Sequence, residues 1–264
     1  MCVALFCAAA SCAAFGFAAR AHATPSTTFW APSTPYVQPF GVLRVTYDVY
    51  FREKAAYPID IGLEIGVLPW EWLQMEVGFD ALYPLLHGDD PVDVPLVFNA
   101  KVGAPEDVYF VGQPAWSLGI FGVGLEGGLT NQNALSLMVG KTLPYVGVLN
   151  VGGYYGLNGA LFRSADGDSA RIGLMAAWIS PSIEVPLVDH IGLMWDIQTG
   201  ENAMGATGGG LSVYFTPAIA LLTGPVFFFE RELQPGGTSW LWSVQIDIDV
   251  DLAPDDDASS GEEP

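Results

Sequence analysis

Apolar and polar residues alternate at every second position over most of this 264-residue chain. In the run 40–51, written FGVLRVTYDVYF, Leu43 and Val45 fall on one face, whereas Arg44 and Asp48 fall on the other. A period of two is the side-chain period of a β-strand, because successive side chains point to opposite faces of a sheet. The pattern recurs in eleven further runs, at 59–68, 73–81, 95–103, 115–125, 134–142, 147–157, 171–179, 190–199, 209–216, 218–228 and 239–252.

Twelve runs of about ten residues each predict an all-β chain that forms a closed antiparallel transmembrane β-barrel over residues 40–252. Bacterial outer-membrane barrels have an even number of strands, and each strand must cross an apolar band about 25 Å tall. Alternation is weakest in 115–125 and 218–228, so ten strands remain an alternative. A soluble β-sandwich is a further alternative, and a membrane helix at 211–229 is disfavoured by Pro217 and Pro225.

The connections between the runs alternate in length, as in these barrels, where periplasmic turns are short and outer loops are long. Proline marks the short set at Pro69, Pro144, Pro181 and Pro217, and the connection 103–114 is an exception because it is long. Tryptophan rings favour the two membrane-water interfaces. Those at the ends of the expected strands are Trp70, Trp72, Trp116 and Trp178 on the periplasmic side, and Trp240 and Trp242 on the outer side.

The first 23 residues have the composition of a signal peptide that directs export. An apolar Ala/Phe/Cys core precedes Ala21-His22-Ala23, a small-x-small pattern that predicts cleavage after Ala23. The alternative is a permanent N-terminal membrane helix. Residues 24–39 are expected to form a periplasmic segment ahead of the barrel.

The chain is strongly acidic, with 29 acidic and 9 basic residues. Because the expected signal peptide holds one arginine and no acid, the exported chain has 29 acids against eight bases, a formal charge of −21. Such a charge makes nucleic acid an unlikely partner, so none is expected. Residues 253–264 include five of the acids and are expected to be a disordered acidic tail.

Several short stretches of the chain carry a family resemblance: FWAP at 29–32, QPFGV at 38–42, TYD at 46–48, PIDIGL at 58–63, GVLP at 66–69, FNAK at 98–101 and LLTGPV at 221–226. In these stretches the sequence resembles an uncharacterised family of porin-like outer-membrane β-barrel proteins of Gram-negative bacteria. The resemblance implies a barrel and an outer-membrane location, but no activity and no site residues. The chain departs from such barrels in ending twelve residues after Leu252 rather than on an aromatic residue.

The polar face of each expected strand predicts the lining of the lumen, since the lipid-facing side must be apolar. The lumen-lining residues are expected to be Arg44, Asp48, Asp60, Glu64, Gln74, Glu76, Asp80, Asn99, Lys101, Arg171, Asp196, Gln198 and Asp247. Seven of these are acids and three are bases. Any pore is therefore predicted to prefer cations.

Motifs that would indicate catalysis or a cofactor are weak. The run GVGLEG at 122–127 has the spacing of a dinucleotide loop, but a loop and another strand follow it where a helix is needed. His87 and His190 are expected at opposite ends of the barrel and cannot share a site. His87, Asp89, Asp90 and Asp93 could hold a divalent cation between the loop and lipopolysaccharide through their carboxylates. Their spacing matches no EF-hand, and a solvated acidic loop is the preferred interpretation. No enzyme activity, cofactor or metal is expected.

The leading functional hypothesis is a narrow passive channel or transporter for small solutes. A closed structural or adhesive barrel is the alternative, because an ion-paired lumen and a hydrated lumen need the same residue types. A soluble periplasmic binding protein with a β-sandwich fold ranks third. The expected partners are outer-membrane lipid, lipopolysaccharide, the barrel assembly machinery and small solutes.

Overall fold

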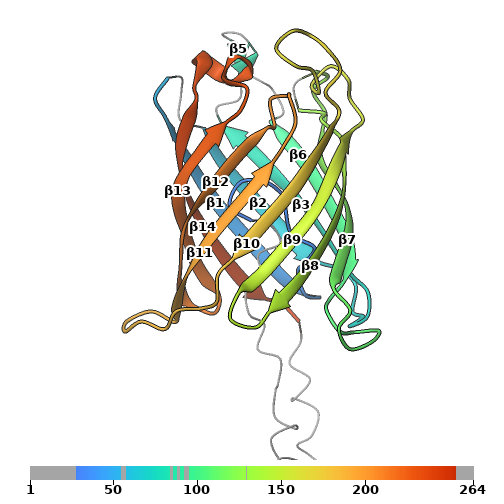
Figure 1. The fold of residues 1–264 in the computed structure, drawn as a ribbon, viewed down its shortest axis with the longest axis vertical. Helices are drawn as coiled ribbons and strands as arrows, with labels where there is room; N and C mark the ends of the chain where they lie inside the picture. Colours follow the sequence, from blue (N-terminus) through green and yellow to red (C-terminus); the bar gives the residue numbers. More distant parts are fainter. Residues whose placement is uncertain are drawn as a thin grey trace, which may run out of the picture.

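The computed structural model describes residues 28–54, 58–83, 95–128 and 130–253, together with the backbone of 86–87 and 90–91. Twelve antiparallel strands close into one barrel, so the twelve-strand prediction is confirmed, and the ten-strand and β-sandwich alternatives are wrong (Figure 1). The barrel strands are β1 (Val42–Arg52), β2 (Ile59–Gly66), β3 (Gln74–Tyr83), β6 (Leu96–Ala104), β7 (Ala115–Gly124), β8 (Ala134–Leu143), β9 (Gly147–Gly156), β10 (Ile172–Ile179), β11 (His190–Gln198), β12 (Ala206–Thr216), β13 (Ile219–Phe228) and β14 (Trp240–Asp251).

Smaller elements lie at one end of the barrel. A two-stranded sheet of β4 (Leu86–His87) and β5 (Asp90–Pro91) and two short 3-10 helices, η1 (Arg231–Leu233) and η2 (Pro235–Gly237), belong to the loops of this end. No helix in the described part of the chain is long and apolar enough to cross a membrane. The range 211–229 forms the end of β12, a turn at 217–218 and β13, so the helix alternative for it is wrong.

Strand β14 shows how the alternation in sequence becomes two environments. Trp242 and Ile246 point outward and are exposed, whereas Leu241, Ser243 and Gln245 point inward and are buried. Elsewhere the outward side chains are also apolar, and Leu174 is 66% exposed. An apolar outer face of the sheet is the arrangement that a lipid environment stabilises.

The two ends of the barrel differ in their connections. We call the end where β1 begins and β14 ends the terminal end, and the opposite end the loop end. The terminal end has tight turns at 144–146 and 217–218, but also longer connections at 105–114 and 180–189. The long connection at 103–114 is therefore not the only exception at this end.

Residues 28–39 lie inside the barrel (Figure 1), which corrects the expectation that the segment 24–39 is periplasmic. We call residues 28–39 the inner segment. Its side chains Phe29, Ala31, Thr34 and Gln38 are almost completely buried. The remaining residues of the expected segment, 24–27, lie outside the described residues, as do the expected signal peptide with Ala23 and residues 254–264 of the expected tail.

Candidate functional site: the barrel lumen

The first anchor of the inner segment in the lumen is a buried carboxylate of β11. Asp196 of β11 accepts hydrogen bonds at Oδ2 from Thr28 Oγ1 at 2.6 Å, from the backbone N–H of Trp30 at 2.7 Å and from that of Ala31 at 3.0 Å. Bonds to an ionised acceptor are stronger than bonds between neutral groups. Asp196 is fully buried by these contacts, so it faces inward as predicted but is covered by the segment.

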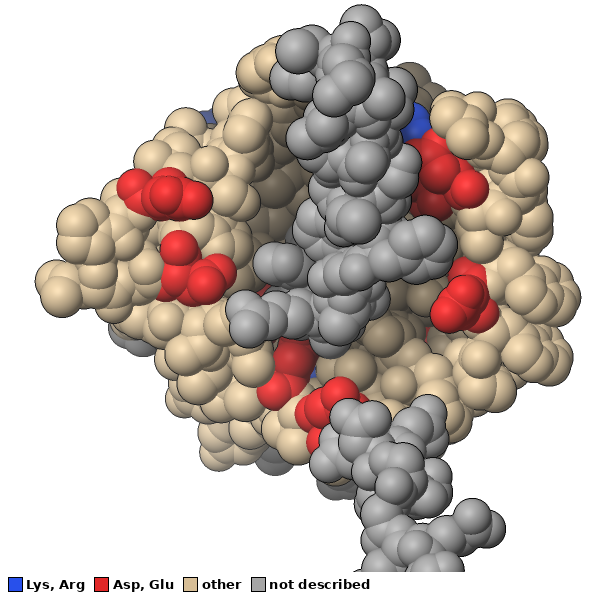
Figure 2. All heavy atoms as spheres, turned by 90° about the horizontal axis from the view of Figure 1, so that it is seen from below, with Lys and Arg blue, Asp and Glu red and all other residues tan. Residues whose placement is uncertain are grey.

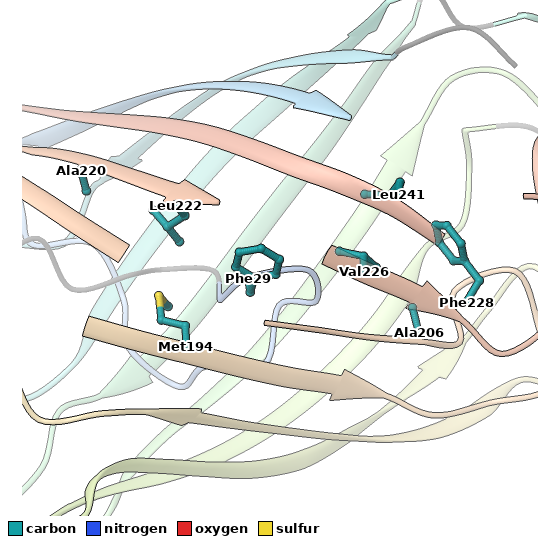
Figure 3. Packing of buried hydrophobic residues seen from close by; sticks show 8 residues of the cluster. All are labelled: Phe29, Met194, Ala206, Ala220, Leu222, Val226, Phe228 and Leu241. Atoms are coloured by element: carbon teal, nitrogen blue, oxygen red, sulfur yellow. The ribbon is translucent and has the colours of Figure 1, made fainter. Parts of the chain in front are cut away.

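An apolar cluster fills the lumen beside this anchor. Figure 3 shows the ring of Phe29 among side chains of β11, β12, β13 and β14, including Met194, Leu222 and Val226. The wall is shaped to receive the ring, because a Cβ atom added at Gly208 would lie 2.9 Å from Phe29. A second apolar cluster, around Phe162 of the β9–β10 connection, fills the space against β8, β9 and β10.

The inner segment has a second anchor near the terminal end. The backbone N–H of Gln38 donates to Glu76 Oε2 at 2.6 Å, and its side-chain amide donates to Asp249 Oδ1 at 3.1 Å. Glycines in the wall make room here too: a Cβ atom at Gly66 would collide with the backbone of Gln38 and Pro39. The segment is thus fixed at both ends.

At the rim of the terminal end, Glu106 ties the inner segment to the wall. Its carboxylate accepts from Tyr36 Oη at 2.5 Å and from the backbone N–H and hydroxyl of Thr142, and it pairs with Lys141 Nζ at 2.9 Å. Burial alone would raise the pKa of Glu106, but the hydrogen bonds from Tyr36, Lys141 and Thr142 lower this pKa below its ordinary value of 4.5. The carboxylate is therefore stabilised in its charged form.

Beside the inner segment the lumen contains a cavity of about 800 Å³. Most of its wall comes from β1, β2, β3, β6 and β7, with Phe29 and Trp30 of the inner segment on the other side. Nine of the predicted lumen-lining residues border it: Arg44, Asp48, Asp60, Glu64, Glu76, Asp80, Asn99, Lys101 and Asp247.

Four residues of the predicted lining lie elsewhere. Asp196 and Gln198 face inward but are fully buried away from the cavity. Gln74 is the first residue of β3 at the terminal end, and Arg171 precedes β10 and lies beside Gly159 of the preceding loop. The inner segment covers Asp196, and the folded β9–β10 loop lies against Arg171, which strand alternation alone does not reveal.

The charges nearest the terminal end are paired. Arg44 Nε lies 2.8 Å from Asp249 Oδ1, and Lys101 Nζ lies 2.8 Å from Glu76 Oε1. Arg44 also stands directly opposite Glu64 in the β1–β2 ladder. Acids and bases therefore alternate around this part of the wall.

The next two rows toward the loop end contain acids without bases. One row runs Asp247, Thr46, Gly62, Asp80 across β14, β1, β2 and β3, and the row above it places Asp48 opposite Asp60. Asn99 Nδ2 donates to Asp80 at 2.5 Å, and Tyr50 Oη donates to Asp48 Oδ2 at 3.0 Å. Around the whole cavity, six acids face three bases, because Arg52 joins Arg44 and Lys101.

The mouth at the terminal end is also acidic. Figure 2 shows acidic side chains spaced around this end, with little basic surface between them. The exposed acids of the connections and strand ends here are Glu71, Asp107, Glu184, Asp189 and Asp251. The acidic mouth extends the negative field of the cavity to the end of the barrel.

The six predicted interface tryptophans lie near the strand ends. Trp70 and Trp72 stack at 5.5 Å in the β2–β3 turn and are exposed. Trp116 and Trp178 point outward from β7 and β10, and Trp178 Nε1 donates to Val146 of the β8–β9 turn. At the loop end, Trp240 and Trp242 point outward from β14. Trp195 lies opposite Trp178 in the ladder.

Sequence reasoning did not select Asp249, Tyr50 and Arg52 as lining residues, although each sits on the polar face of its strand. It also gave no role to Thr28 and Trp30. The strand residues could have been found by extending the alternation to the end of each strand. The inner segment has no two-residue period. The available signal for its place inside the barrel was its apolar and proline-rich composition directly before the first strand.

The residues tested for chemistry are dispersed. His190 begins β11 at the terminal end, stacks on Tyr214 and contacts Asp189 at 2.8 Å. His87 belongs to β4 in the connection between β3 and β6, at the loop end, and the side chains of His87, Asp89, Asp90 and Asp93 lie outside the described residues. Within the described part of the chain, no group of three His, Cys, Asp or Glu residues is arranged to hold a metal ion.

No protein-family model and no curated protein match the chain. Its structural neighbours are outer-membrane porin-like barrels. An outer membrane channel from Pseudomonas putida F1 is 11% identical with a TM-score of 0.47, and the match covers 84% of this chain and all of that one. The NanC porin is 10% identical with a TM-score of 0.47, covering 77% and 98%. OmpF of Salmonella typhi is 6% identical with a TM-score of 0.36, covering 79% and 96%.

Proposed function

We propose that the protein is an outer-membrane channel for small cationic solutes, narrowed by its inner segment. The observation that carries the proposal is the cavity, where six acids face three bases inside a wall of low dielectric constant. An excess of one charge in such a space attracts counter-ions, because the field is focused rather than screened. The exposed acids around the mouth at the terminal end attract cations in the same way where the lumen opens.

In this proposal the terminal end faces the periplasm and the loop end faces outward. The apolar exterior contacts lipid and, at the outer leaflet, lipopolysaccharide, after export by the signal peptide and insertion by the barrel assembly machinery. No catalytic role, cofactor or nucleic-acid partner belongs to the proposal. The mature protein should partition with outer membranes and migrate faster in unheated gels than after boiling. Recovery from the periplasm without detergent would contradict it.

A closed structural or adhesive barrel remains the second candidate, favoured by specific contacts. The pairs Arg44–Asp249 and Lys101–Glu76, together with Gln38 between them, occupy the lumen near the terminal end. A barrel held in this state would conduct nothing.

Recording from the purified protein in a planar bilayer separates the two candidates. A channel should give discrete conductance steps, and a salt gradient should give a reversal potential of the sign set by cation flow. Absence of conductance in protein that is folded by the gel-shift test would favour the closed barrel. Anion preference would contradict the proposed cation channel.

A further inference from the structure

The two acid rows of the cavity differ from the paired charges beneath them in containing no base of their own, although Arg44 of the paired row lies near Asp247. Asp247 and Asp80 flank the small residues Thr46 and Gly62 in one row, and Asp48 stands opposite Asp60 in the next. Inward residues of one strand recur about 7 Å apart, so the two rows are separated by about that distance. The carboxylates are therefore spread along the cavity wall and do not converge on a single position.

Part of this negative charge has no donor within the protein. The Oδ1 atoms of Asp48 and Asp60 are buried and have no hydrogen-bond partner. Buried carboxylates without a donor or counter-charge are costly. The adjacent cavity is the space from which a positive charge could approach and offset this cost.

An aromatic surface lies directly beside the acids. The ring of Tyr50, whose hydroxyl bonds Asp48, meets the ring of Trp30 edge-on with centroids 5.7 Å apart, and Trp30 also meets Phe228 at 5.4 Å. Trp30 and Tyr50 both border the cavity. Faces of tryptophan and tyrosine attract organic cations, whereas small hydrated metal ions gain more from converging oxygen ligands.

From these features we infer that the cavity binds organic polyamines, with one ammonium group at each acid row and the carbon chain against Trp30 and Tyr50. The inference rests on the proposed channel function and names the solute class that the channel would favour. Three observations support an extended amine over a metal ion: the acids lie in two rows, they do not converge into a metal site within the described residues, and aromatic rings adjoin them. The cavity volume of about 800 Å³ accommodates such a chain.

The test is a calorimetric titration of the folded, detergent-solubilised protein with spermidine. The titration is then repeated in the presence of Mg²⁺. Binding should saturate, and Mg²⁺ at equal charge concentration should leave most of it in place. The double variant Asp60→Asn/Asp80→Asn should weaken binding at least tenfold. The matched control Asp166→Asn/Asp168→Asn removes two exposed acids from the β9–β10 loop and should not.

Trp30→Leu should weaken spermidine binding about threefold or more while leaving Mg²⁺ binding unchanged, since only the organic cation uses the ring. The gel-shift test shows whether each variant is folded. Equal displacement by Mg²⁺, or unchanged binding in the Asp60/Asp80 variant, would overturn the inference.

The same protein in a planar bilayer distinguishes this inference from the proposed function. Cation-selective conductance without spermidine binding would overturn the inference and leave the channel intact. Spermidine binding without conductance would support the site and contradict the channel.

Discussion

On the side of β11, β12, β13 and β14 the lumen is filled by Phe29 and its apolar neighbours, whereas on the side of β1, β2, β3 and β6 it holds a cavity lined with charges. The two sides belong to the same closed sheet, and both alternate between lipid and lumen. They differ in what the inward positions carry: Leu222 and Val226 on one side, and Asp60 and Asp80 on the other. A strand pattern therefore reports that a residue faces the lumen, but not whether the lumen there is filled.

The largest expected difference between the two sides is the loss of folding stability when a lysine is introduced at an inward position. Val226→Lys would place an ammonium group among Phe29 and Leu241 without an acceptor, at a cost of roughly 3–5 kcal/mol. Thr46→Lys would place the same group between Asp247 and Gly62, in the acid row, where it gains counter-charges. Urea unfolding followed by the gel shift should show a large loss of stability for Val226→Lys only. Equal losses would show that the two sides are not different environments.

A smaller effect is expected from loosening the inner segment. Phe29→Ala removes a fully buried ring, at a cost of roughly 3 kcal/mol, and should weaken docking of the segment while the strand ladder persists. Single-channel conductance should then rise above that of the wild type. The control is Phe227→Ala, which truncates an exposed outward ring one strand position from the lumen-facing Phe228. A rise in both variants, or in neither, would contradict a narrowing role for the segment.

The smallest effect is the pH dependence of the rim contact at Glu106. Because the pKa of Glu106 in the folded protein is below its ordinary value of 4.5, the charged carboxylate adds stability above that pH. This contribution is lost as the pH falls through the lowered pKa. The stability difference between wild type and Glu106→Gln should therefore be present at neutral pH and shrink below pH 4.5 in thermal unfolding curves. A difference that grows on acidification would contradict the assignment.

The strands could be predicted because each of them has one face toward lipid and one face toward the lumen. This difference appears in the local sequence as an alternation of apolar and polar residues. The position of the inner segment could not, because its contacts join residues far apart: Thr28 bonds Asp196, and Gln38 bonds Glu76 and Asp249. The contact of Thr28 with Asp196 also explains why Asp196 faces inward without bordering the cavity. The charge excess was predictable in sign, since acids outnumber bases on the polar faces.

The central claim, that the charged side of the lumen is a path for cations, is tested most directly by reversal potentials of charge-reversed variants. Asp60→Lys/Asp80→Lys changes the two acid rows, and Asp166→Lys/Asp168→Lys makes the same change of net charge on exposed positions of the β9–β10 loop. Measured in a planar bilayer under a salt gradient, the cavity variant should lose or reverse the cation preference of the wild type, whereas the loop variant should retain it. The same shift in both variants, or none in the cavity variant, would contradict the account.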